Sequence, residues 1–94
     1  MACGLPANIA SYATLLHLLA KECSYKEGEL IGYLVDTHIY ENHINGLKCQ
    51  IAKNPFHSPN IITSNFTSVF DWSWKDSKIH NYQSHDKIKF EVAV

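Results

Sequence analysis

This sequence contains no arginine. Its eight basic residues are all lysines, scattered along 94 positions, and nine acidic residues bring the net charge to −1. A protein that binds a nucleic-acid polymer needs a basic stripe to neutralise phosphates, and none is present. A chain that holds a nucleotide phosphate by itself commonly uses the bidentate guanidinium that is missing here. We therefore expect no nucleic-acid partner, and we expect any phosphate site to be completed by another segment.

The cysteines and histidines also lack the spacings that are typical of disulfide frameworks and metal sites. Three cysteines, an odd number with no Cys-x-x-Cys pair, argue against a disulfide framework and indicate a reducing, cytoplasmic location. The six histidines lack the tight ligand spacing of structural zinc, so no metal is expected. The opening residues lack the charged start and apolar run of a signal peptide. The apolar stretch at about 9–20 is too short and too polar to span a membrane, so no membrane partner is expected.

The composition that is present belongs to a globular protein. Hydrophobic residues make up 46% and charged residues 18%, which is unlike a disordered chain. Ninety-four residues permit one small domain, whose burial is marginal unless a partner covers apolar surface. We therefore expect a single unit over residues 1–94 that packs against something else, and self-association of the isolated chain.

The first half of the chain predicts two helices with a strand between them. Pro6 and Asn8 open a helix at about 8–23, because proline suits a first helical turn and asparagine can cap it. Residues 29–40 predict a strand. A second helix is predicted at about 41–53, and it ends before a proline.

The signals are weaker in the second half. Residues 61–63 predict a short strand, and residues 74–82 predict another. A turn at 69–72 is expected to bury Phe70, and the tail beyond residue 86 alternates apolar and polar residues. Gly46 lies inside the second predicted helix, where it costs about 1 kcal/mol relative to alanine unless something needs the space.

Three polar side chains are predicted to lie on one face of the strand at 29–40. Successive side chains of a strand point to opposite faces, so Asp36, His38 and Tyr40 share one side. An acceptor, an imidazole and a phenol in a row can bind a hydroxylated ligand such as a sugar. Taken alone the row is weak, because half-buried strands often show the same alternation.

Two further stretches strengthen the case for a site. The run Gly-Leu-Pro-Ala-Asn-Ile-Ala-Ser-Tyr at 4–12 lies upstream of Asp-Thr-His-Ile-Tyr at 36–40, and Phe-Glu-Val-Ala-Val stands at 90–94. Together they resemble thymidylate synthase, whose signature pairs a Gly-Leu-Pro-Phe-Asn-Ile-Ala-Ser-Tyr run with an Asp-Thr-His-Ile-Tyr strand. The resemblance covers about residues 4–94. It implies an α+β fragment of the thymidylate synthase fold, with two helices and strands of a mixed sheet.

The resemblance also implies roles for particular residues. Asn8 matches the asparagine that pairs with N3–H and O4 of uracil, since a carboxamide both donates and accepts; its local sequence alone fits a helix cap. His38 and Tyr40 match the residues that hydrogen-bond the deoxyribose 3′-hydroxyl. Gly4 matches a glycine whose backbone lies against the folate and the nucleotide. Val94 matches the end of a tail that closes over the cofactor, although a chain end otherwise frays.

The neighbours of these positions are given lesser roles. Asp36 is expected to brace the side chains beside it by hydrogen bonds. Asn42 and His43 are expected only to start the second helix. Ala7 stands where the family has a phenylalanine of the folate pocket, which leaves the affinity for folate open.

The family's nucleophile is not expected in this sequence. It is a cysteine in a Pro-Cys motif upstream of the Gly-Leu-Pro run, and none of Cys3, Cys23 and Cys49 follows a proline. The resemblance thus implies a carboxyl-terminal segment, about the last third of the family chain, with no catalytic residue and no activity alone.

Two functions remain open from the sequence. In the first, an amino-terminal thymidylate synthase segment joins this chain, and the dimeric assembly methylates dUMP to dTMP with 5,10-methylenetetrahydrofolate. In the second, the chain is a non-catalytic remnant, or a nucleotide-binding or interaction protein derived from that family.

Overall fold

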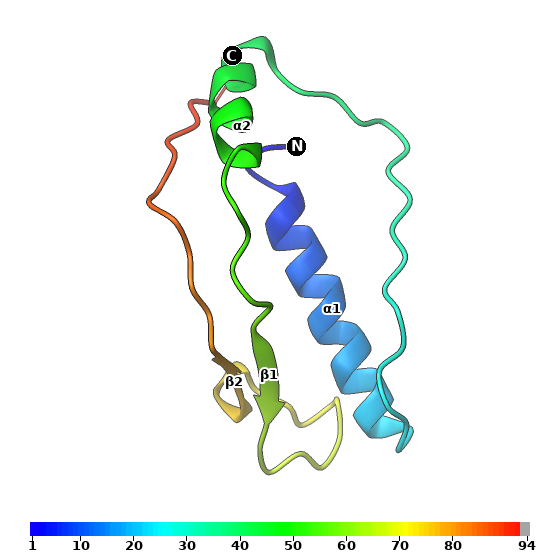
Figure 1. Ribbon diagram of the computed structural model, residues 1–94. Coiled ribbons are helices and arrows are strands. Elements are labelled where there is room, and N and C mark those ends of the chain that lie inside the picture. The colour runs from blue at the N-terminus through cyan, green and yellow to red at the C-terminus, as the bar shows by residue number, and fades with distance from the viewer. Residues whose placement is uncertain (93–94) are drawn as a thin grey trace.

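The computed structural model describes residues 1–92 of the chain. In chain order its elements are α1 (Leu5–Glu22), the 3-10 turn η1 (Glu41–His43), α2 (Ile44–Ile51), β1 (Asn60–Thr63), the 3-10 turn η2 (Trp74–Asp76) and β2 (Ser77–His80). Figure 1 shows α2 at one end of the molecule and the two strands at the other, with α1 running between them. Stretches without helix or strand connect the two ends, and the molecule is elongated, with extents of 45 × 29 × 23 Å.

Helix α1 confirms the first predicted helix, although it starts at Leu5 rather than at about residue 8. Its N-cap is Gly4, which has no side chain to cap with, and a proline lies in the first turn. Asn8 lies inside the helix, where its backbone N–H donates to the Gly4 carbonyl at 3.1 Å. The interpretation of Asn8 as the helix cap is therefore wrong, and its side chain is not used to begin the helix.

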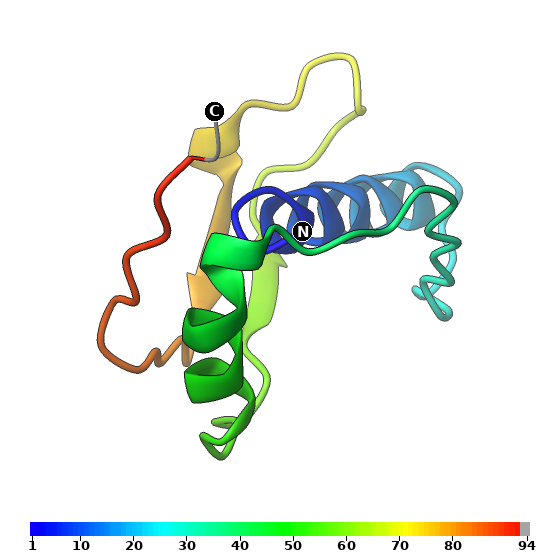
Figure 2. The same cartoon turned by 90° about the horizontal axis from the view of Figure 1, so that it is seen from above.

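The second predicted helix is confirmed as η1 followed directly by α2, which ends at Ile51. The two helices point in clearly different directions when the molecule is seen from above (Figure 2). Gly46 lies in α2, and a Cβ built there would come within 2.5 Å of Cε1 of the Phe90 ring. The ring therefore occupies the space that a larger residue would need, which explains a glycine inside a helix.

One sheet is present in residues 1–92, and it consists of β1 and β2 in antiparallel register, with Asn60 opposite His80 and Thr63 opposite Ser77. The predicted strand at 61–63 is confirmed. The strand at 74–82 is confirmed only over Ser77–His80, because the residues before it form η2. These elements agree with an α+β fragment, whereas the mixed sheet stays a prediction for a larger assembly.

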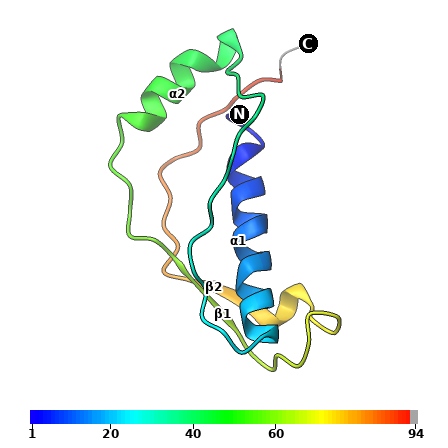
Figure 3. The same cartoon turned by 90° about the vertical axis from the view of Figure 1, so that its right-hand side faces the viewer.

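Two expectations for this part of the fold are wrong. Residues 29–40 form no strand, since a strand needs a neighbour to satisfy its backbone groups and residues 1–92 offer none beside it. The segment instead runs alongside α1 (Figures 2 and 3). A turn does occur at 69–71, but Phe70 is 91% exposed. The neighbouring Trp72 is the residue tied to the fold, through a hydrogen bond from Nε1 to Ser77 Oγ at 2.9 Å.

Very little of the chain is buried. Among the described residues the buried side chains are those of Leu18, Ala20, His17 and His43. Several large apolar side chains of α1 stay open to solvent, namely Ile9, Tyr12, Leu15 and Leu19. Apolar surface of this extent suits a segment that packs against more protein, and self-association remains a prediction. None of the helices in residues 1–92 has the length and apolar character needed to cross a membrane.

Candidate functional site

A pocket of about 370 Å³ lies between the start of α1 and the extended segment at 33–38. Gly4, the N-cap of α1, and Asn8, in its first turn, line the pocket on one side, and His38 lines it from the facing segment. Positions four apart on a helix share one face, which is why Gly4 and Asn8 reach the same pocket. The structure therefore brings three of the five predicted site residues together, and their binding roles stay predictions.

His38 and Tyr40 share a side, as expected, even though they do not lie on a strand. Their rings meet edge to face with centroids 5.4 Å apart. An extended backbone places alternate side chains on one side whether or not a neighbouring strand is present. Tyr40 does not line the pocket, so it lies next to the pocket residue His38 rather than on the pocket wall. Val94 lies outside the described residues.

Asp36 lines the same pocket but braces its neighbour only weakly. Its Oδ1 lies 3.9 Å from His38 Nδ1, which is beyond hydrogen-bond distance. Its side chain is 98% exposed, and ion pairs in water contribute little. The expected hydrogen bonds from Asp36 are not formed in this structure.

His43 is the N-cap of α2, which confirms its expected place at the start of the second helix, but it also makes contacts next to the site that the sequence did not predict. It is 3% exposed, and its Nε2–H donates to the Glu91 carbonyl at 2.5 Å. Asn42 donates to the same carbonyl from Nδ2 at 3.3 Å. The His43 ring also contacts Tyr40 on one side and Phe90 on the other. No local signal predicts these additional contacts of His43, because its hydrogen-bond partner lies in the tail.

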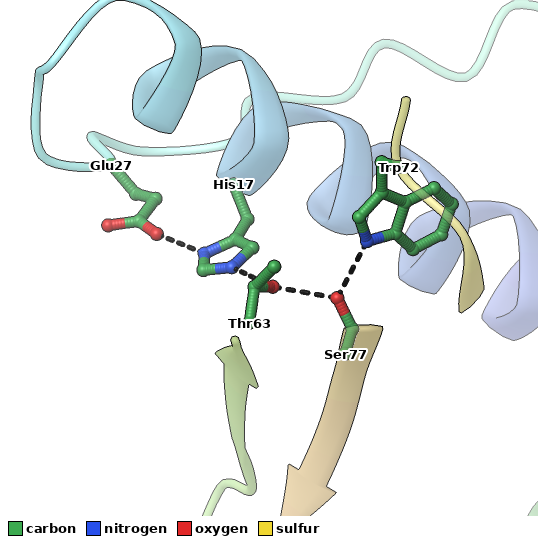
Figure 4. A network of polar contacts seen from close by, with 5 residues as sticks. All are labelled: His17, Glu27, Thr63, Trp72 and Ser77. Atoms are coloured by element: carbon green, nitrogen blue, oxygen red, sulfur yellow. Dashed lines mark hydrogen bonds and ion pairs between the residues drawn. The ribbon is translucent and has the colours of Figure 1, made fainter. Parts of the chain in front are cut away.

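A second polar cluster lies at the other end of α1 and is shown in Figure 4. His17, 6% exposed, contacts Glu27 through Nδ1 and Thr63 Oγ1 through Nε2, the latter at 2.8 Å. Thr63 Oγ1 lies 2.7 Å from Ser77 Oγ, which accepts from Trp72 Nε1. An indole can only donate, so the hydrogen bonds can run in one direction from Trp72 to Glu27, with the histidine proton on Nδ1.

The cluster satisfies its members within the chain and ties α1 to both strands. Hydrogen bonds from its own backbone N–H and then from the His17 side chain hold the pKa of the Glu27 carboxyl below its ordinary value of 4.5. The cluster lies away from the pocket, and its polar atoms are paired with one another. We therefore assign it to the stability of the fold and not to ligand binding.

No group of three or more metal-ligating side chains occurs in the part of the chain that the structure describes. The polar groups that line the candidate site include backbone groups, a carboxamide, an imidazole and the exposed carboxylate of Asp36. Such groups can hydrogen-bond a polar ring and a hydroxyl group. No lysine or arginine that could bind a phosphate is among the residues that line this pocket.

Comparison with known proteins identifies the family. The model of the thymidylate synthase family matches residues 1–94. The bifunctional dihydrofolate reductase-thymidylate synthase of Paramecium tetraurelia is 45% identical over 91 residues, which are 97% of this chain and 20% of that protein. The thymidylate synthases of Staphylococcus haemolyticus and Mycoplasma pneumoniae are 44% and 41% identical over 91 residues, which cover 29% and 32% of their lengths.

The chain therefore spans about a fifth to a third of the length of these relatives. The match runs through both sequence motifs that suggested the resemblance, and it includes the residues that line the pocket. The chain belongs to the thymidylate synthase family.

Proposed function

We propose that this chain forms the carboxyl-terminal part of a thymidylate synthase, which methylates dUMP to dTMP with 5,10-methylenetetrahydrofolate. Family membership over residues 1–94 supports the activity. The observation that supports the assignment of residues is a pocket lined by both Asn8 and His38, which come from separate segments.

In this proposal the chain binds and orients the nucleotide. Asn8 pairs with N3–H and O4 of uracil, because its carboxamide offers an acceptor and a donor side by side. His38 and Tyr40 hydrogen-bond the 3′-hydroxyl of the deoxyribose. The cysteine that attacks C6 of uracil, and the cations that hold the phosphate, come from an amino-terminal segment. We expect a partner chain to supply that segment, within a cytoplasmic homodimer, and we expect no turnover without it.

In this proposal Gly4 is the first candidate contact of the folate cofactor. A Cβ added to Gly4 would meet nothing within 4 Å, so a flat ring system has a clear approach to the backbone there. Ala7 is exposed and offers a single methyl group where the family has an aromatic ring. Val94 is the second candidate contact. When bound, the cofactor supplies the carbon and the hydride of the new methyl group.

A fusion enzyme tests the proposal. The amino-terminal part of the Staphylococcus haemolyticus thymidylate synthase, up to the point where the match begins, is joined to this chain. The fusion is expected to release tritium from [5-³H]dUMP in the presence of the cofactor, whereas the separate 94-residue chain releases none. The control is the same fusion with its Pro-Cys cysteine replaced by alanine. A fusion that neither binds nor turns over dUMP overturns the proposal, and so does cysteine-dependent turnover by this chain alone.

Ala7 favours a second candidate, a non-catalytic protein that kept only the nucleotide site. This candidate predicts a fusion that binds dUMP but has no activity, even after Ala7→Phe restores the aromatic ring of the family. Turnover that appears or rises with Ala7→Phe supports the enzyme instead. Thermal unfolding of both fusions shows whether the substitution acts on folding or on the cofactor.

A further inference from the structure

The ring of Phe90 contacts α2 at Gly46. The other three glycines of the chain have no neighbour as close as this ring. A Cβ at Gly46 would lie 2.5, 3.1 and 3.3 Å from three atoms of the Phe90 ring. Beside Gly4, Gly28 and Gly32 a Cβ would meet nothing within 4 Å. Contacts below 3.0 Å force one of the two groups to move, and the group met here is the outer edge of the Phe90 ring, so alanine at Gly46 displaces the ring from its observed place.

The residue after Phe90 is held at the same place by hydrogen bonds. The Glu91 carbonyl accepts from His43 Nε2 at 2.5 Å and from Asn42 Nδ2 at 3.3 Å. The Phe90 ring meets the His43 ring edge to face, with centroids 5.2 Å apart. A ring contact and two hydrogen bonds from η1 therefore dock this part of the tail onto the start of α2.

The docked ring is the first of four aromatic rings in contact. His43 meets Tyr40 with centroids 5.6 Å apart and planes at 85°, and Tyr40 meets His38 at 5.4 Å and 75°. Edge-to-face contacts favour particular orientations of both rings. Because the Nε2–H of His43 is committed to the tail, the orientation of His43 depends on docking, and Tyr40 packs against that ring.

We propose that Phe90 is a positioning residue, whose docking at Gly46 sets the orientation of Tyr40 and His38 through His43. The proposal rests on the proposed function in one respect, that Tyr40 and His38 hold the sugar 3′-hydroxyl. Tyr40 is 46% exposed, and its ring contacts are with the two histidines. When the tail leaves α2, His43 loses its acceptor and Tyr40 loses a fixed neighbour. Hydrogen bonding to the 3′-hydroxyl then weakens, while recognition of the base by Asn8 does not change.

The test compares two nucleotides in the fusion enzyme. In Gly46→Ala and in Phe90→Ala, the affinity for dUMP is expected to fall about 3- to 10-fold, as for one weakened hydrogen-bonded group. The affinity for 2′,3′-dideoxyuridine 5′-monophosphate, which lacks the 3′-hydroxyl, is expected to stay the same. Gly28→Ala is the matched control, because its Cβ meets open space. A merely structural defect would lower the affinity for both nucleotides alike, and that result would overturn the proposal.

A double substitution separates docking from helix stability. In a Phe90→Ala background the ring is gone, so Gly46→Ala is expected to change dUMP affinity no further. Additive losses from the two changes would contradict a shared contact. If Gly46→Ala prevents folding, the affinities for the two nucleotides are compared in Phe90→Leu instead.

A spectroscopic signature follows docking without any nucleotide. The Nε2 proton of His43 is expected to give a slowly exchanging downfield NMR signal in the fusion and in Gly28→Ala. The signal is expected to disappear in Gly46→Ala and Phe90→Ala. Its persistence in both variants overturns the proposal, whereas a fusion that shows the signal but never binds dUMP contradicts only the proposed function.

Discussion

The strand end and the pocket end of this molecule are held together by different kinds of contact. At the strand end, β1 and β2 pair along their whole length, and His17 is buried in a cluster whose polar atoms bond one another. At the pocket end, residues 29–40 have no neighbouring strand within residues 1–92, and His38 and Tyr40 are exposed and in ring contact. A structural histidine has its polar atoms satisfied by the fold. A ligand-binding histidine must keep some of them available.

The largest expected effect is on nucleotide affinity at the pocket end. Asn8→Asp in the fusion enzyme should weaken dUMP binding by about 1–3 kcal/mol or more, because a carboxylate facing O4 is left without a donor. The same change offers an acceptor to the amino group of cytosine, so dCMP should gain relative to dUMP. Affinities of both nucleotides are measured by calorimetry, with Asn45→Asp on α2 as the control. An unchanged preference would remove Asn8 from the base site.

The next effect concerns the strand end. His17→Ala should lower the free energy of unfolding of the fusion by about 1–3 kcal/mol, because Thr63 and Glu27 lose their partner and a buried ring is removed. Denaturant unfolding measures it, and His57→Ala is the control, since His57 is exposed in a loop. Affinity for dUMP should change little in either variant. Equal stability losses at the two positions would contradict the structural role of His17.

The smallest effect is a dependence on pH at the same cluster. The pKa of Glu27 is lowered in the fold, so its contribution to stability is fully present above the ordinary value of 4.5. That contribution should be lost as the pH falls through the lower folded value, because protonation removes the charged acceptor of His17. The stability of the Glu27→Gln variant should therefore fall less steeply with decreasing pH than that of the parent fusion. Circular dichroism between neutral and acidic pH follows the unfolding of both proteins. The same slope in both proteins would show that Glu27 does not contribute in this way.

The helices could be predicted because their signals are local. A proline in the first turn and apolar residues at helical spacing specify α1, and Pro55 limits α2. The short strand at 61–63 has β-branched residues that favour extended backbone. The error at 29–40 has the opposite cause. Alternation of side chains can be read from sequence, but a strand also needs a neighbour, and sequence does not say which segment that is.

The candidate site was partly predictable for the same reason. Asn8, His38 and Tyr40 belong to short motifs, so each could be predicted without knowing its surroundings, and their binding roles stay predictions. The contacts of His43 and of Gly46 could not be predicted in this way, because each is made with the tail, at Glu91 and Phe90. The same is true of His17, whose partners come from a loop and from β1.

The sequence by itself determined the family, the two helices, and the residue types that can bind a base and a sugar, since each of these is written in contiguous motifs. Tertiary structure alone decided which polar residues are buried and paired, and which face a pocket. Burial and hydrogen bonding arise between segments far apart in the chain, and their geometry depends on every element that lies between. The buried, paired His17 and the exposed His38 are the same residue type, and only the fold separates their surroundings.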